Sequence, residues 1–310
     1  MEKTTLLITL FNILVLLLAP FFVIGIIKKT KAFWAGRKGV SIFQPLYDFI
    51  RLFKKDQIIS LTTSWVFRFA PIVIFATTIF AGLFVPMLCG NSIINIEGAF
   101  VIFSYILGLG KFFALISAMD TGSSFEGMGA SREACFTTIV EPAFFIMLAS
   151  IIALTGNYSF KSLSMILSSS GTFGILIAFL AVLALFVMLL TECSRVPVDD
   201  PTTHLELTMI HEVMILDNSG QDLAVITWAA GIKMVVLEAL IANFILPSNL
   251  SIGLSAVLFL AVIGLIAVII GTLESAIARL RMSHVFEFIF SMSSFALIIL
   301  SLVAIKIYGS

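Results

Sequence analysis

The stretch TTLLITLFNILVLLLAPFFVIGII, residues 4–27, contains no charged side chain, and neither does the run over residues 162–191. A helix needs about 20 apolar residues to cross the hydrocarbon core of a bilayer, so each run is long enough to do so. The first run is too long for the core of a signal peptide, and no small-residue cleavage site follows it. We therefore interpret it as a retained helix.

The composition of the 310-residue chain points to the same class. Hydrophobic residues make up 60% of it and charged residues 12%, whereas soluble domains are about 45–50% apolar. The sequence predicts an all-α polytopic membrane protein that forms a single integral membrane domain over residues 1–310. The eight predicted spans lie at about residues 5–27, 65–88, 98–119, 134–155, 171–191, 223–246, 252–273 and 285–306.

Lysine and arginine are distributed unequally between the predicted loops. The loops after the first, third, fifth and seventh spans hold twelve of the 18 Lys and Arg residues, whereas the opposite face holds only Lys3, Lys161 and Lys306. Positively charged loops stay in the cytoplasm. We therefore predict a multi-pass protein of the cytoplasmic (inner) membrane, with its long loops in the cytoplasm and both termini on the outer face.

The predicted cytoplasmic loop over residues 28–64 contains a helix of its own. In GRKGVSIFQPLYDFIRLFKKD, residues 36–56, apolar residues recur at helical spacing from Phe43 to Phe53, and charged residues take the other side. This pattern is typical of an amphipathic helix lying in the membrane interface, and Pro45 fits its first turn. Such a helix can be a surface anchor, or it can line a cavity where the helix bundle meets a partner.

Four charged residues fall well inside predicted spans, namely Lys111, Glu141, Lys233 and Glu238. Each costs a few kcal/mol at the bilayer centre, so each is expected to face the bundle interior beside a partner on another helix. We expect Lys111 or Lys233 to pair with Glu141 or Glu238. Glu141 can be half of a structural ion pair or a carboxylate that carries protons. Glu133 is predicted in the first turn of the fourth span, where the helix dipole favours an acid.

An acidic loop is predicted over residues 192–222. It holds seven acids, a single arginine, Arg195, and two of the three histidines of the chain. Pro197 and Pro201 break the chain there, and the sequence DDPTT offers caps for a short helix that begins near residue 202. Acids at a membrane entrance that lead to buried acids and lysines suit the mouth of a proton or ion path. They equally suit contact with a basic partner surface.

The sequence shows no complete catalytic or metal-binding motif. Ile215 stands where a metalloprotease helix that contains His211 would need its second histidine. The three cysteines form no C-x-x-C pair, and no glycine-rich phosphate loop is present. We therefore predict no catalytic residue, no metal and no cofactor in this chain. The histidines are expected to hydrogen bond to a partner subunit or to loop backbone.

Three motifs carry a resemblance to a known family. They are residues 36–56, the stretch GMGASREACFTTIVEPAFF at 127–145, and the stretch ECSRVPVDDPTTHLELTMIHEVMILDNSG at 192–220. They resemble the complex I subunit 1 family over essentially the whole chain. Quinone-reducing members of that family read near ETNRxPFDLPEAESEL in the third motif. This chain resembles instead the branch found in membrane-bound (group 4) nickel–iron hydrogenases and formate hydrogenlyases.

The resemblance implies a membrane-anchor and coupling subunit, itself non-catalytic, of an oxidoreductase complex. Such a subunit docks cytoplasmic catalytic and iron–sulfur subunits and helps couple their electron transfer to proton or ion translocation. The implied partners are a nickel–iron hydrogenase-like large subunit, an iron–sulfur small subunit, a ferredoxin-like subunit and antiporter-like membrane subunits, in a lipid membrane and without nucleic acid. The nickel–iron centre and the iron–sulfur clusters would belong to those partners.

Two alternatives stay open. The chain can be a quinone-binding membrane subunit of a complex I-type NADH dehydrogenase, although its third motif departs from the quinone-reducing form. It can also be a stand-alone secondary transporter, although no internal repeat of the kind common in transporters is evident.

Burial and the motif match together assign two groups of residues. Glu133 and Glu141 correspond to the SRE…EP acids of the family, and Gln44 and Pro45 to the helix at its quinone cavity. The residues predicted on a proton or ion path are Lys111, Glu133, Glu141, Glu192, Glu206, Glu212, Lys233 and Glu238. The residues predicted at the partner interface are Gly36, Arg37, Gln44, Pro45, Asp48, Arg132, Arg195, Asp199, Asp200, His204 and His211.

Overall fold

The computed structural model describes residues 2–88, 90, 92–160, 163, 166, 171–200, 209–247 and 250–308. Among these residues, eight helices are long and apolar enough to cross a membrane, which confirms the predicted all-α fold and number of spans. They are α1 (Glu2–Trp34), α3 (Trp65–Gly82), α4 (Ala99–Asp120), α5 (Ser124–Thr155), α7 (Gly171–Glu192), α9 (Gly220–Ile245), α10 (Ile252–Ala276) and α11 (Met282–Tyr308). Two shorter helices, α2 (Gln44–Phe53) and α8 (His211–Met214), lie in loops.

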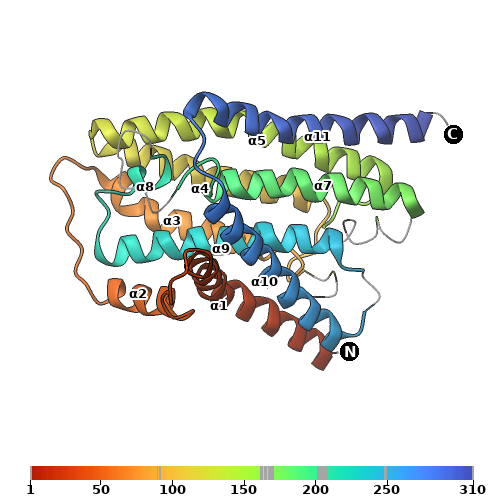
Figure 1. Ribbon diagram of the computed structural model, residues 1–310, viewed down its shortest axis with the longest axis horizontal. Helices are drawn as coiled ribbons and strands as arrows, with labels where there is room; N and C mark the ends of the chain where they lie inside the picture. The colour runs from red at the N-terminus through yellow and green to blue at the C-terminus, as the bar shows by residue number, and fades with distance from the viewer. Residues whose placement is uncertain are drawn as a thin grey trace.

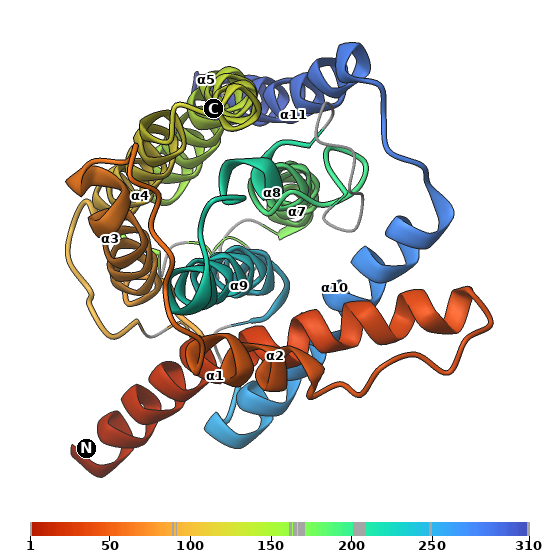
Figure 2. The ribbon, with the colours of Figure 1, turned by 90° about the vertical axis from the view of Figure 1, so that its left-hand side faces the viewer.

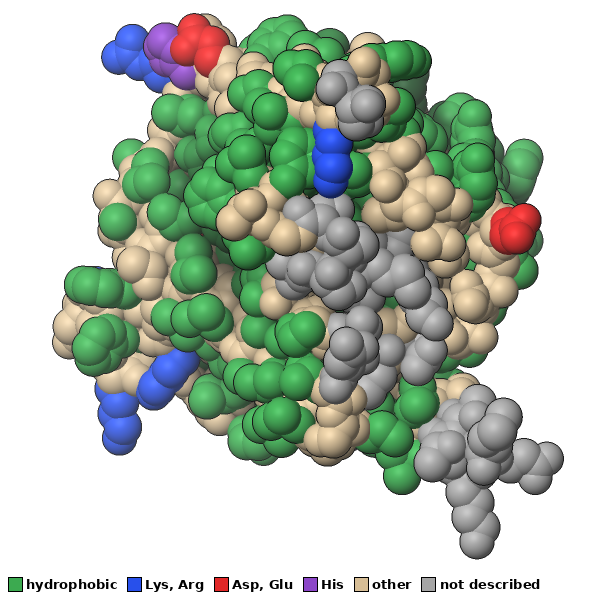
Figure 3. Space-filling view, turned by 90° about the vertical axis from the view of Figure 1, so that its right-hand side faces the viewer, with side chains coloured by type: hydrophobic (Ala, Val, Ile, Leu, Met, Phe, Trp, Pro, Cys, Tyr) green, Lys and Arg blue, Asp and Glu red, His purple; other side chains and the backbone are tan. Residues whose placement is uncertain are grey.

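The spanning helices run roughly along the long axis of the molecule, so it has two distinct ends (Figure 1). The start of α1 and the end of α11 lie at the same end, as an even number of spans requires. Helices α2 and α8 lie towards the opposite end, which we call the α2/α8 end. Figure 3 views the end that carries the termini, where hydrophobic side chains cover much of the visible surface and charged side chains are scattered.

Helix α9 lies at the centre of the bundle. It packs against α1, α2, α3, α7 and α10, and 67% of its apolar window is buried, the largest share among the eight spans. Viewed from the α2/α8 end, α7 and α9 are surrounded by the other helices, and α8 lies in front of α7 (Figure 2). A helix that is apolar on all sides is expected in such a central place. The charged residues of α9 are therefore carried into the interior of the protein.

Helix α5 begins ten residues before the predicted start of the fourth span, at Ser124 rather than near residue 134. The fourth span was predicted to start directly after a charged residue, Glu133. A charged residue limits how deeply a helix can be buried in lipid, but it does not end the helix. Glu126 occupies the first turn of α5. The prediction that Glu133 lies in the first turn is therefore wrong, because Glu133 lies more than two turns inside the helix.

The amphipathic helix predicted in the first long loop is present as α2, and it packs on α1 and α9. The ring of Phe49 lies 5.0 Å from that of Trp228 on α9 and 5.4 Å from that of Phe21 on α1. On the opposite side of α2, Tyr47 is exposed, and Phe53 is exposed at the end of the helix. Helix α2 therefore presents apolar residues both to the bundle and to its surroundings, so the two predicted roles are compatible.

The carboxylate of Asp199 connects the two described parts of the acidic loop, residues 192–200 and 209–222. Asp199 is buried, and it accepts hydrogen bonds from the backbone nitrogens of Ile210 (3.1 Å) and His211 (3.3 Å). It also forms an ion pair with Arg279 at 3.3 Å. These contacts fix the start of α8 beneath the link between α10 and α11. The predicted helix start near residue 202 lies outside the described residues.

Substitution of Gly129 by alanine should move α8. A Cβ atom at Gly129 would overlap the side chain of Val213 on α8 and lie 2.8 Å from the carbonyl oxygen of Ile210. Overpacking of this kind typically costs about 1–3 kcal/mol. Gly127→Ala is a matched control in the same helix, because a Cβ atom there meets nothing within 4 Å. We expect thermal unfolding of the purified protein in detergent to show a lower midpoint for Gly129→Ala alone; equal midpoints would contradict the observed α5–α8 packing.

Candidate functional site

Helix α7 ends inside the molecule, well short of the α2/α8 end (Figure 1), and it ends on a carboxylate, Glu192. Neighbouring helices bring lysines to the same depth. Lys111 lies about 14 Å from the last residue of α4, and Lys233 lies about 20 Å from the first residue of α9, at 1.5 Å per residue. Because both lysines are far from a helix end, neither can reach water by extending along its own helix.

Both lysines contact the carboxylate of Glu192. Lys111 donates a hydrogen bond to one carboxylate oxygen, and the ammonium group of Lys233 lies 3.4 Å from the other. The Glu192 side chain is 6% exposed, and those of Lys111 and Lys233 are 12% and 14% exposed. Buried charges are tolerated when they are paired and hydrogen-bonded in this way.

Two acids on α5 extend this arrangement. The ammonium group of Lys111 lies 3.9 Å from Glu141 and donates a hydrogen bond to Thr137 (3.1 Å), one helical turn away from Glu141. Glu133 lies on the same face of α5, nearer to α8, and its side chain is 6% exposed. We call Lys111, Glu133, Glu141, Glu192 and Lys233 the Glu192 cluster. It joins α4, α5, α7 and α9.

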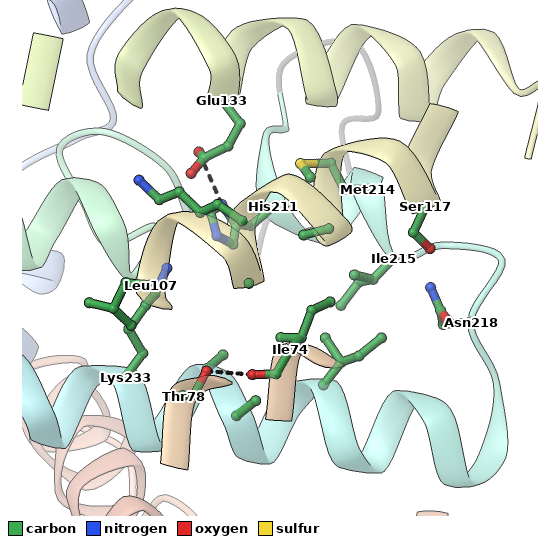
Figure 4. Close-up of a pocket in the computed structure, with 16 residues that line it drawn as sticks. Ile74, Thr78, Leu107, Ser117, Glu133, His211, Met214, Ile215, Asn218 and Lys233 are labelled. Carbon is green, nitrogen blue, oxygen red and sulfur yellow. Dashed lines mark hydrogen bonds and ion pairs between the residues drawn. The ribbon is translucent and has the colours of Figure 1, made fainter. Parts of the chain in front are cut away.

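His211, the first residue of α8, adjoins the cluster. Its Nδ1 atom lies 3.5 Å from a carboxylate oxygen of Glu133, and the two side chains point towards one another (Figure 4). Burial removes hydration from the imidazolium form and so lowers the pKa of His211, while the nearby carboxylate of Glu133 acts in the opposite direction. The neutral imidazole is therefore favoured at this position.

A small cavity adjoins the cluster. It has a volume of about 90 Å³, and its lining includes Lys111, Glu133, His211 and Lys233 (Figure 4). A single water needs about 10–15 Å³ measured in this way, and it needs two or more polar partners. The cavity therefore has both the room and the polar groups to hold several waters beside the charged side chains.

A larger cavity of about 700 Å³ lies between α1, α2, α9, α10 and the end of α7. Its apolar lining includes Phe21, Phe49 and Trp228, and its polar lining includes Glu192 and Glu212. Helix α2 therefore lines a cavity through its inner side, which is the second of the two roles considered for it. His211 belongs to the lining of both cavities.

A second group of paired charges borders the large cavity. The side chain of Glu274 on α10 is 0% exposed, and it pairs with Lys31 at 2.9 Å and with Arg195 at 3.3 Å. The importance of Glu274 is missed by the sequence analysis, because the seventh predicted span ends one residue before it. An acid placed directly after a span could have been recognised as a partner for the two cations.

The predicted pairing of the intramembrane charges is partly wrong. Lys111 does lie near Glu141, but both lysines share Glu192, which was not considered as their partner. Glu141 was expected to face the interior, yet its side chain is 43% exposed. Glu238 is fully buried, and no hydrogen-bond partner for either carboxylate oxygen is found among the described residues. It lies five residues after Lys233, about 140° around α9, so it faces away from the cluster.

Several residues predicted at the partner interface are buried or half-buried in the structure, and they contact other residues of this chain. Arg132 donates a hydrogen bond to the carbonyl oxygen of Met209 (2.9 Å), and Arg195 pairs with Glu274. Asp199 is buried beneath α8, and Asp200, which follows it, is half-buried. The structure therefore places these residues where they shape the loop from within.

The remaining predicted interface residues lie nearer the surface. Gly36 and Arg37 are exposed in the link between α1 and α2. In α2, Gln44 donates a hydrogen bond to Asp48 (2.8 Å), and Pro45 is buried against the bundle. His204 and Glu206, the other residues assigned to the loop, lie outside the described residues.

These features define a multi-pass membrane protein with a buried, ion-paired cluster beside two cavities. Residues 6–306 match the family model described as NADH dehydrogenase, so the chain belongs to this family. The resemblance drawn from the three motifs is thereby confirmed.

Individual relatives separate into two groups. The chain is 30% identical to hydrogenase-4 component C of Escherichia coli (strain K12), over 92% of each chain. It is 26% identical to formate hydrogenlyase subunit 4 of the same organism, over 83% of this chain and 85% of the relative. Its identity with NADH-ubiquinone oxidoreductase chain 1 of Trichosurus vulpecula is 27%, over 61% of each chain.

The same fold occurs in a solved complex. A chain in the structure of the membrane-bound sulfane sulfur reductase, an archaeal respiratory membrane complex, superimposes with a TM-score of 0.80. The match covers 97% of this chain and 99% of that one, at 20% sequence identity. It establishes the arrangement of the helices.

Glu192→Gln should destabilise the bundle. The substitution removes the one negative charge that Lys111 and Lys233 share, and breaking a buried pair from one side typically costs about 3–5 kcal/mol. Glu287→Gln, at a side chain that is 74% exposed, serves as the control and should change stability by less than about 0.5 kcal/mol. Thermal unfolding midpoints in detergent test this expectation, and an unchanged midpoint for Glu192→Gln would show that the pairs are not structural.

His211 should make stability depend on pH. Its folded-state pKa lies below the ordinary value of 6.5, so the unfolded chain takes up the proton first as pH falls. This contribution to stability is complete above pH 6.5 and is lost as pH decreases towards the folded-state pKa. Unfolding midpoints measured from pH 7.5 to 5.5 should therefore fall less steeply for His211→Gln than for the wild type. His284→Gln, at an exposed histidine, should keep the wild-type slope.

Proposed function

We propose that this chain is the membrane-anchor and coupling subunit of a membrane-bound nickel–iron hydrogenase-type complex. It docks the catalytic and iron–sulfur subunits at the α2/α8 end, and it helps couple their electron transfer to movement of protons or other ions. The observation that carries this proposal is the Glu192 cluster, because paired ionisable side chains inside a membrane bundle, next to a cavity that can hold water, typically mark ion or proton pathways.

The hydrogenase branch is favoured by the extent of the matches. The two relatives named after hydrogen-metabolising complexes match this chain over 92% and 83% of its length, whereas the NADH-ubiquinone oxidoreductase chains 1 match it over between 61% and 78%. We assign the nickel–iron centre and the iron–sulfur clusters to the partner subunits, and the role of anchor and coupler to this chain. We place the α2/α8 end in the cytoplasm because its loops carry most of the Lys and Arg residues.

The cluster provides a series of neighbouring proton carriers. Glu212 and His211 border the large cavity, and Glu133 lies 3.5 Å beyond His211. From there the small cavity reaches Lys111, which contacts both Glu192 and Glu141. Carboxylates and lysines joined by waters can exchange protons over such distances. The series runs from the α2/α8 end to the outer surface of α5.

The exposure of Glu141 favours a membrane partner at this surface. Glu141 lies about 26 Å along α5 from Ser124, and a carboxylate facing lipid at such a depth costs a few kcal/mol. A polar group supplied by another membrane subunit would remove that cost. We therefore place an antiporter-like membrane subunit against α4 and α5, with Glu141 as the group through which the cluster continues into it.

The docking face is proposed at the loops around α2. Ile58 and Leu61, in the link between α2 and α3, are 78% and 104% exposed. Exposed apolar residues in a polar loop typically mark a contact with another protein. We assign Gly36 and Arg37, in the link between α1 and α2, to the same docking face.

A quinone-binding subunit is the second candidate, and the large cavity favours it. A volume of about 700 Å³ with aromatic walls suits a hydrophobic ring ligand. Labelling of the intact complex with a quinone-site inhibitor distinguishes the two. Quinone-dependent turnover together with labelling of residues in this cavity would favour the quinone-binding subunit, whereas hydrogen turnover without quinone would favour the first proposal. Transport by the purified chain alone would favour a stand-alone transporter.

Purification of the native assembly through a tag on this chain tests the proposal directly. We expect nickel, iron and several other subunits to co-purify, and we expect the chain alone to show no redox activity. Mass spectrometry and metal analysis provide the readout. An assembly without nickel would contradict a hydrogenase-type complex, and a chain that purifies alone from gently solubilised membranes would contradict the anchor role.

Glu141→Gln should leave the complex assembled and impair its coupling. The amide keeps the shape of the side chain but loses the titratable proton, so ion uptake driven by electron transfer should fall at least about tenfold. Inverted membrane vesicles supplied with the electron donor allow turnover and ion uptake to be measured together. Glu97→Gln, at an exposed residue remote from the cluster, is the control. Normal coupling in Glu141→Gln would reduce Glu141 to a structural role.

A further inference from the structure

His211 is a polar residue in the wall that separates the small cavity, beside the Glu192 cluster, from the large cavity, beside α2. Four described residues line both of them, and the other three, Ile215, Ile226 and Ala230, are apolar. An apolar wall offers no stepping point for a proton, whereas an imidazole can accept a proton on one nitrogen and release one from the other. The side chain of His211 is 30% exposed, so its ring is enclosed but reachable.

The surroundings of His211 hold its backbone and leave the inner ring nitrogen available. Asp199 accepts a hydrogen bond from the backbone nitrogen of His211, and α8 packs closely on α5 at Gly129. Nδ1 has no hydrogen-bond partner among the described residues, although Glu133 lies 3.5 Å away. A buried ring nitrogen without a protein partner is uncommon. Nδ1 of His211 is therefore available for exchange with Glu133 or with water in the small cavity.

We propose that His211 passes protons between the large cavity and the Glu192 cluster. This inference rests on the proposed coupling function and assigns a proton-transfer role to a residue that the sequence placed at the partner interface. It makes α8 part of the path as well as part of the docking face.

The transfer balances as one proton in and one proton out. Starting from the tautomer with its proton on Nδ1, the imidazole accepts a proton on Nε2 from water in the large cavity. The resulting imidazolium releases the Nδ1 proton to the carboxylate of Glu133. The neutral ring then carries its remaining proton on Nε2, and transfer of that proton to Nδ1 through bridging water restores the starting tautomer. Glu133 passes the released proton on through water in the small cavity.

Both acidic and basic side chains surround His211, so the ring can gain a proton and lose it again. Burial and Lys233 lower the pKa of His211, and Glu133, Asp199 and Glu192 raise it. A neutral imidazole at pH 7 is ready to accept a proton, and the nearby acids make its charged form accessible for the transfer. The charged groups facing it are Glu133 from α5, Lys111 from α4, Glu192 from α7, Lys233 from α9, Asp199 from the preceding segment and Glu212 from α8 itself.

Substitution in the intact complex, combined with chemical rescue, tests the proposal. His211→Gln keeps a polar side chain of similar size, and His211→Ala leaves space that imidazole from the medium can fill through the large cavity. We expect both variants to assemble with the normal subunits and to lose at least about tenfold of donor-driven proton uptake in vesicles. Added imidazole should restore uptake several-fold in His211→Ala and much less in His211→Gln.

The controls separate a relay from a structural role. His284→Gln removes an exposed histidine and should show neither loss nor rescue. Wild-type coupling in both His211 variants would overturn the proposal, and so would a loss in assembled complexes that imidazole fails to restore. If His211 variants couple normally while Glu141→Gln does not, the relay is wrong and the coupling function stands. If wild-type vesicles take up another ion but no protons during turnover, the relay is wrong and the coupling function stands. If they take up neither protons nor other ions, the coupling function itself fails.

Discussion

The burial of Glu192 is the constraint on which the arrangement of the central helices depends. Transfer of a carboxylate or an ammonium group from water into a protein interior costs several kcal/mol, and a partner must compensate for it. Glu192 has two partners, Lys111 and Lys233, so α4 and α9 must approach the end of α7 at one depth. The chain then leaves α7 towards Asp199, which orders the start of α8. Glu192 thus sets the depth at which α4, α7 and α9 meet, and Asp199, seven residues further on, holds the start of α8.

The Glu192 cluster is not a set of closed, neutral pairs. If all its members are ionised, three carboxylates face two lysines, which leaves one negative charge. The charged lining of the large cavity is also not balanced, because the acids Asp48, Glu192, Glu212 and Glu274 face the cations Lys28, Lys31 and Arg195. His211 lines both cavities, so it lies next to acids that exceed their cation partners in number and can accept a proton from it. A purely structural network would be expected to balance its charges locally.

The sequence predicts the helices well because the bilayer requires long uncharged runs, and residues 4–27 and 162–191 satisfy that requirement unaided. It also predicts that α2 is amphipathic. It does not predict which helices are neighbours, so the shared role of Glu192 could not be derived. Of the expected pairs, the structure brings Lys111 and Glu141 together, whereas Glu238 has no such partner among the described residues. Pairing depends on the rotation of each helix within the bundle, and residue type does not encode that rotation. Glu274 and the early start of α5 were missed because a count of apolar residues ends at the first charge.

On the proposed function, docking and coupling are performed by the same short elements. Helix α2 presents Tyr47 and Phe53 outwards, while its inner side lines the large cavity and contacts α9 at Trp228. Helix α8 carries His211 towards the cluster and rests on α5 at Gly129. A partner that presses on the α2/α8 end therefore acts on the walls of both cavities without moving a spanning helix. Because packed interfaces switch between discrete arrangements, a small displacement of α8 can change the contact between His211 and Glu133. That coupling requires no redox group within the membrane bundle, only an imidazole whose position depends on what is docked above it.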